Sequence, residues 1–147
     1  MIVVIALGAY TISQKKAVAP TDLTPQIVTA SHCGLIIDNP PVGSTVTFPL
    51  TINAVVDNTQ AQALGCSWVV FEAQSGTVTV KDGSGNVLAQ TFLSTTADWM
   101  TTSPTPYTAT IASLSNPSYT GPLTLTFEEE NPSGEGIPDT LVVNVVK

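Results

Sequence analysis

Carboxylates gather near the C-terminal end of the chain, at a spacing that could hold a cation. Glu128, Glu129 and Glu130 are consecutive, and Glu135 and Asp139 follow in a polar, turn-forming segment. Calcium binds to carboxylate and carbonyl oxygens, so Glu128, Glu130 and Asp139 are its candidate ligands. The segment matches no calcium-loop signature, and strand alternation would turn Glu129 away from its two neighbours. We therefore favour a solvated acidic edge without a metal.

The residue patterns that hydrolases and phosphoryl-transfer enzymes use for catalysis are either missing from the sequence or badly placed in it. A glycosidase needs two carboxylates facing one sugar, one of them with a pKa raised by burial, whereas these carboxylates lie on a polar turn. The sequence has no Gly-x-Ser-x-Gly motif and no phosphate-cradling glycine loop with a lysine. Its one histidine, His32, falls in a predicted tether, so a Ser-His-Asp triad would need that tether ordered against a distant serine. We predict neither an enzyme nor a cofactor.

The two cysteines, Cys33 and Cys66, stand in no CxxC pair, and only one of them neighbours His32. This inventory is too small for the usual four-ligand zinc sites. A disulfide and two buried thiols remain as alternatives, and the low charge content, typical of an exported domain, favours the disulfide. It would close a loop of about 34 residues and stabilise the fold by roughly 3–4 kcal/mol in the chain-entropy model.

The amino-acid composition limits which kinds of molecule the chain can bind. The net charge is −7, and the chain contains only four lysines and no arginine. Phosphate contacts need lysine or arginine, so we expect neither nucleic-acid binding nor charge-driven adhesion to anionic lipid. Charged residues make up 10% of the 147 residues, below the usual quarter, and Thr, Ser and Asn supply the polarity instead. That mixture suits a β-rich surface outside the cytoplasm.

Asp98, Trp99 and Met100 lie between two predicted strands, in a chain that is only 6% aromatic. A tryptophan at such a crossing most often fills the end of the core, with its indole N–H bonded to a carbonyl. The alternative is a partner surface formed by these three residues. Asp98 is expected to accept hydrogen bonds from backbone N–H groups of the turn.

The N-terminal part differs from the rest. Residues 1–12 are apolar, but a membrane-spanning helix needs about 20 residues. No basic flank precedes the run. We predict a short anchor, or the end of one that starts before Met1; a cleaved signal peptide and an ordinary strand of β-branched residues are the alternatives. Residues 13–34 contain two prolines and many small polar residues, which predict a tether.

Residues 35–147 alternate between apolar and polar side chains, the pattern of half-buried strands. Turn segments rich in Gly, Pro, Asn and Asp separate these runs, and no stretch of ten or more residues has helical spacing with caps. We predict a two-sheet β-sandwich of about seven strands. The predicted strands include 50–56, 67–73, 77–80, 87–93, 122–127 and 141–146.

Several segments occur in an order that resembles a known module. They are NPPVGSTVTFPLTI, WVVFEA, DGSGNVLAQ, ADWMTT and FEEENPSGEGIPDTLVVNV. This set is similar to the immunoglobulin-like domain of bacterial spore-germination and related envelope proteins, the second of the germination-associated module types. The chain departs from that pattern in the long loop before Trp68, in its two cysteines and in a less aromatic strand. The resemblance implies an extracytoplasmic accessory module and leaves its ligand open.

The sequence therefore predicts a non-enzymatic module of the bacterial cell envelope, membrane-anchored or at the cell surface, that contacts a protein or a cell-wall component. Only residues 1–12 would enter a membrane. The alternative is a subunit of a surface filament, a homo-polymer in which residues 1–12 complete a neighbour's sheet as a donor strand. Because sandwich folds host many functions, both hypotheses rest on the resemblance and the fold.

Overall fold

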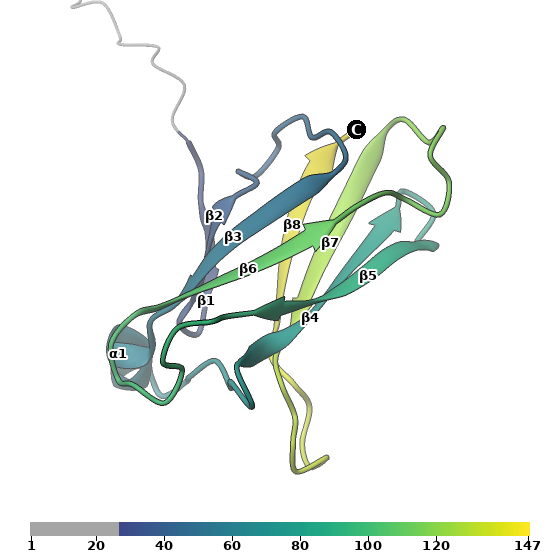
Figure 1. Ribbon diagram of the computed structural model, residues 1–147. Coiled ribbons are helices and arrows are strands. Elements are labelled where there is room, and N and C mark those ends of the chain that lie inside the picture. The colour runs from purple at the N-terminus through teal and green to yellow at the C-terminus, as the bar shows by residue number, and fades with distance from the viewer. Residues whose placement is uncertain (1–26) are drawn as a thin grey trace, which may run out of the picture.

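The computed structural model describes residues 27–147, in which nearly all of the regular secondary structure is β-strand (Figure 1). The all-β prediction is confirmed. The predicted anchor at 1–12 and most of the predicted tether lie outside the described residues. Within them, one α-helical turn, α1, is followed by a 3-10 turn, η1, and no helix is long and apolar enough to cross a membrane. The elements are β1 (Ala30–His32), β2 (Leu35–Asn39), β3 (Leu50–Val56), α1 (Asn58–Ala61), η1 (Gln62–Leu64), β4 (Gln74–Asp82), β5 (Val87–Ser94), β6 (Thr105–Ile111), β7 (Pro122–Glu128) and β8 (Thr140–Val146).

All eight strands belong to one sheet, in the order β1-β2-β3-β6-β5-β4-β7-β8, and neighbours pair antiparallel. The pairing of β5 with β6 is limited to Ser94 and Thr108, so the sheet bends sharply between two four-stranded halves. The strand pairing thus gives one strongly curved sheet instead of two separate ones. Alternation fixes which face of a strand is buried, but it does not say which strands pair across the bend.

The outermost strands, β1 and β8, lie side by side, so the sheet is nearly closed into a barrel. Residues 43–46, which follow β2, cover the part of the β8 edge that does not lie beside β1. Gly43 N–H donates to the Asn144 carbonyl (2.7 Å), and Val46 N–H donates to the Val146 carbonyl (2.8 Å). Because an unpaired strand edge invites pairing with other chains, this cover protects the sheet. The sheet begins at Ala30, inside the segment predicted as a tether.

The core follows the predicted alternation. On β3, Leu50, Ile52, Ala54 and Val56 face inward, with polar or less buried residues between them. The neighbouring strand β6 and strand β7 of the other half of the sheet repeat this alternation. The core is closed by Trp68, which is 1% exposed. Its indole Nε1–H donates to the Ser75 carbonyl at 2.6 Å, as a buried tryptophan requires.

Two predictions about the tryptophans are corrected. Trp99 is half-buried and lies outside the core cluster, so the core-filling role belongs to Trp68. The predicted strand at 67–73 is not formed. Glu72 and Ala73 have positive φ angles of 49° and 64°, and Phe71 pairs back onto Gln74 across this tight turn. Because Glu72 and Ala73 adopt left-handed backbone angles, an extended strand cannot continue through them into β4.

Candidate functional site

A groove of about 170 Å³ lies where the helical turn meets the loop that enters β6. Two aromatic residues, two valines and seven hydroxyl or amide side chains line it, and none of these described residues is charged. The lining is Val56, Asn58, Thr59, Gln62, Val70, Trp99, Thr101, Thr102, Ser103, Thr105 and Tyr107. Of the predicted partner surface, Trp99 alone contributes to this groove, while Met100 projects beside it and is 77% exposed.

The loop that carries Trp99 is held by its own side chains. Asp98 Oδ1 accepts a hydrogen bond from Met100 N–H at 3.1 Å, which confirms its predicted capping role. Thr95 Oγ1 accepts from Ala97 N–H (3.0 Å), and Thr101 Oγ1 accepts from Ser103 N–H (3.1 Å). Three consecutive side-chain turns of this kind fix the loop without help from a regular element.

The opposite wall of the groove is fixed by Asn58. Its Oδ1 accepts from Trp68 N–H (2.9 Å), and its Nδ2 donates to the Trp68 carbonyl (3.1 Å). Asn58 thus couples the groove to the tryptophan that closes the core. Both the oxygen and the nitrogen of the Asn58 amide are therefore already hydrogen-bonded. The polar groups of the lining that can bind a ligand are the Thr and Ser hydroxyls and the Gln62 amide.

Tyr107 lines the groove from inside the sheet and is 1% exposed. Its phenolic oxygen has no hydrogen-bond partner among residues 27–147, and burial raises the pKa of this phenol above 10.0. Most buried polar atoms in proteins have a hydrogen-bond partner, so the unpaired hydroxyl of Tyr107 is unusual. A ligand hydroxyl or a water would satisfy it.

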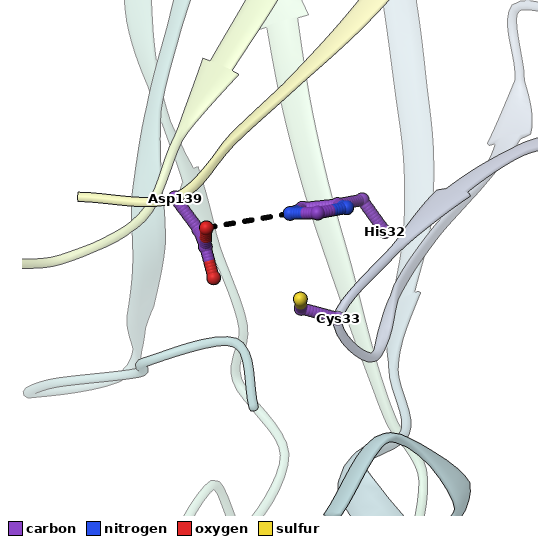
Figure 2. A group of neighbouring side chains, drawn as sticks. All are labelled: His32, Cys33 and Asp139. Carbon is purple, nitrogen blue, oxygen red and sulfur yellow. Dashed lines mark ion pairs between the residues drawn. The ribbon is translucent and has the colours of Figure 1, made fainter. Parts of the chain in front are cut away.

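A second cluster unites His32, Cys33 and Asp139 (Figure 2). His32 ends β1, and Cys33 and Gly34 form the two-residue turn into β2, with φ angles of 45° and 97°. Positive φ at both positions is typical of a type I′ hairpin turn. A Cβ at Gly34 would lie 2.3 Å from Asn58 Oδ1, so the close packing of this turn requires glycine.

Asp139, immediately before β8, faces this turn from the other edge of the sheet. His32 Nε2 and Asp139 Oδ1 are 3.4 Å apart (Figure 2). One ligand atom from each of His32, Cys33 and Asp139 can be chosen so that all three lie within 4.8 Å of one another. The sequence offered no sign of this convergence, because the residues come from opposite ends of the described chain.

Both cysteines are free thiols in the structure, so the predicted disulfide is not seen. The two residues are nevertheless neighbours, as the prediction required. The side-chain hydrogen bond with Cys66, followed by burial and the nearby Asp139, raises the pKa of the Cys33 thiol to about 12.

The candidate calcium ligands, for which a solvated acidic edge was the favoured prediction, do not gather as a group. Asp139 joins His32 and Cys33, and the metal-ligand clusters of the described residues include neither Glu128 nor Glu130. Their neighbour Glu129, which sequence reasoning left without a role, is structural. Its Oε2 accepts from Val69 N–H (2.8 Å) and its Oε1 accepts from Asp139 N–H (3.0 Å).

Comparison with known proteins gives no relative: no family model, no curated protein and no solved structure matches the chain. The resemblance to the germination-associated module therefore stays a prediction. The groove beside Trp99 and the cluster of His32, Cys33 and Asp139 are the two features of the described residues that bear on function.

Proposed function

We propose that the chain is a non-enzymatic binding module that holds a neutral, hydroxyl-rich polymer, such as a cell-wall glycan, in the groove beside Trp99. The observation that carries this proposal is the composition of the groove: a half-buried indole surrounded by hydroxyl and amide side chains, with no charged residue in the lining. A few convergent polar groups around an aromatic surface are typical of ligand sites.

The chemistry of the lining favours a sugar over a peptide or an ion. The apolar face of a sugar ring packs on an aromatic side chain, while its hydroxyls exchange hydrogen bonds with Thr, Ser and Gln. Tyr107, whose buried hydroxyl has no hydrogen-bond partner among the described residues, also lines this groove. An anionic or cationic ligand would find no opposite charge among the lining residues.

The setting of the module is part of the proposal. A β-domain with 10% charged residues and a hydroxyl-rich surface suits a cell envelope, outside the cytoplasm. We propose that its architecture is a variant of the immunoglobulin-like fold in which the two sheets are joined through β5 and β6. The two four-stranded halves and the single β5–β6 pairing support this relationship.

The test is binding to purified wall sacculi and to soluble neutral polysaccharides, followed by co-sedimentation and calorimetry. Trp99→Ala is expected to weaken binding at least tenfold, about 1.4 kcal/mol, because the stacking surface is lost. Phe92→Ala is the matched control, since Phe92 is 56% exposed on β5 and does not line the groove. Equal binding by the parent and Trp99→Ala, or no binding to any glycan, would refute the proposal.

A further inference from the structure

The cluster at the edge of the sheet has the composition of a metal site. His32, Cys33 and Asp139 offer an imidazole nitrogen, a sulfur and a carboxylate oxygen. Cys66 interacts with Cys33 and offers a second sulfur next to this group, although its own sulfur is not among the three converging ligand atoms. Two cysteines and one histidine alone are too few for a four-ligand zinc site, but the fold brings Asp139 beside His32 and Cys33.

We propose that His32, Cys33, Cys66 and Asp139 form a binding site for a zinc-class divalent cation, which clasps β1 to β8. Zinc binds to sulfur, imidazole and carboxylate ligands at about 2.0–2.3 Å, so its tetrahedral ligands lie roughly 3.3–3.8 Å apart. His32 and Asp139 already meet that spacing at 3.4 Å, and the atoms of the three-residue cluster lie within 4.8 Å. Cys66, which neighbours Cys33 but lies outside that three-residue group, would have to turn its sulfur toward the ion to complete the shell.

The ligand types select the metal. Thiol sulfur and imidazole favour zinc and other borderline or soft ions, whereas calcium and magnesium prefer an all-oxygen shell. The cluster provides only one carboxylate, so it does not suit a hard cation. This distinguishes it from the calcium site predicted at Glu128, Glu130 and Asp139.

Hydrogen bonds hold the backbone on both sides of the proposed site, without any metal. Asp57 N–H donates to the Gly34 carbonyl at 2.8 Å, which holds the turn that carries Cys33. Glu129 Oε1 accepts from Asp139 N–H, which holds the other side. Ligands supported in this way lose little conformational freedom on binding. A hollow of about 470 Å³ bordered by His32, Cys33 and Cys66 gives the ion a route to the site.

The site also explains an unusual choice of residue. Cys33 occupies a left-handed position, φ 45°, where Asn, Asp or Gly is the ordinary choice. The turn places its sulfur beside the side chains of His32 and Asp139 (Figure 2). A metal there would join the turn, the segment after η1 and the residue before β8, which are three separate parts of the fold.

The experiment is a cobalt(II) titration of the reduced full chain, monitored by absorbance. We expect one equivalent of cobalt to produce thiolate-to-metal charge-transfer absorption and the intense visible bands of a tetrahedral site. Zinc should then displace cobalt and abolish both. Cys33→Ser, Cys66→Ser and Asp139→Asn should each weaken cobalt binding at least tenfold. Glu135→Gln, which removes an exposed carboxylate from the same connection, should bind like the parent.

Three results would overturn the proposal: no charge-transfer absorption with the reduced parent, unchanged binding by Cys33→Ser, or equal binding after the two cysteines have been oxidised to a disulfide. Circular dichroism identifies a variant that fails to fold, and His32→Ala then serves as the second ligand variant because its side chain is 41% exposed. A zinc-dependent rise in melting temperature in the parent, absent from His32→Ala, would support the clasp independently of the spectra.

Discussion

His32 Nε2 lies 3.4 Å from Asp139 Oδ1, and this contact joins the two outermost strands of the sheet. His32 ends β1 and Asp139 precedes β8, so the pair links the edges at one end. At the other end, backbone bonds from Gly43 and Val46 cover β8. Side chains thus bridge the edges of the sheet at one end, and backbone hydrogen bonds cover β8 at the other.

Without a metal, the His32–Asp139 contact should add little stability. The two side chains are 41% and 43% exposed, and exposed ion pairs are worth at most about 1 kcal/mol. With a chelator present, His32→Ala is expected to lower the free energy of unfolding by less than about 1 kcal/mol in urea titrations, close to a Glu135→Ala control. A loss above 2 kcal/mol in metal-free protein would show that the contact itself holds the edges together.

Glu129 should matter more than either of its acidic neighbours. Its carboxylate accepts hydrogen bonds from Val69 N–H and Asp139 N–H, tying the segment after Trp68 to the β7–β8 connection. Glu129→Ala leaves both donors unpaired and is expected to lower the free energy of unfolding by about 1–3 kcal/mol. Glu128→Ala, at an exposed position in the same run, is the control. Equal stability of the two variants in chemical denaturation would refute this assignment.

Asp82 should make the β4–β5 hairpin pH-sensitive. Hydrogen bonds from the Asn86 side chain and backbone, with a smaller one from Ser84 N–H, hold the pKa of this carboxyl below 3.8. A lowered folded-state pKa means that the stabilisation is fully present above pH 3.8 and is lost as the pH falls through the lower folded value. The difference in melting temperature between the parent and Asp82→Ala should therefore be constant above that pH and shrink below it. A difference that persists unchanged in strong acid would contradict this account.

Much of the fold was accessible from side-chain alternation. The predicted strand at 50–56 coincides with β3, and its inward residues are the ones the period of two selects. The segment at 67–73 failed because periodicity carries no information about Glu72 and Ala73 adopting left-handed backbone angles. Alternation also cannot distinguish one curved sheet from two stacked ones, since both bury the same face of each strand.

The candidate sites were harder to predict, for a different reason. Asp98 was recognised as a turn cap because its partner, Met100, is two residues away. His32 and Asp139 meet only because the sheet curls until β1 lies beside β8. A single sequence does not encode such a contact in any local pattern. Cys33 and Cys66 were paired from their number and from the low charge content of the chain, and the structure places them together as thiols.

The two tryptophans give a test that separates the core from the groove. Trp68 is 1% exposed and its indole N–H is bonded to Ser75, so Trp68→Ala should empty a large buried site and cost about 3–5 kcal/mol of stability. Trp99 is half-buried at the groove, so Trp99→Ala should lower stability by only about 1 kcal/mol. Urea denaturation of both variants measures the two values on one scale.

Fluorescence distinguishes the same two roles without relying on stability. In a Trp68→Phe background, Trp99 should be accessible to iodide and should change its emission when a glycan binds. In a Trp99→Phe background, the emission of Trp68 should be blue-shifted, poorly quenched and unaffected by ligand. Shielding of Trp99 from iodide in the free protein, together with a large loss of stability in Trp99→Ala, would return Trp99 to the core and remove the basis for the groove as a binding site.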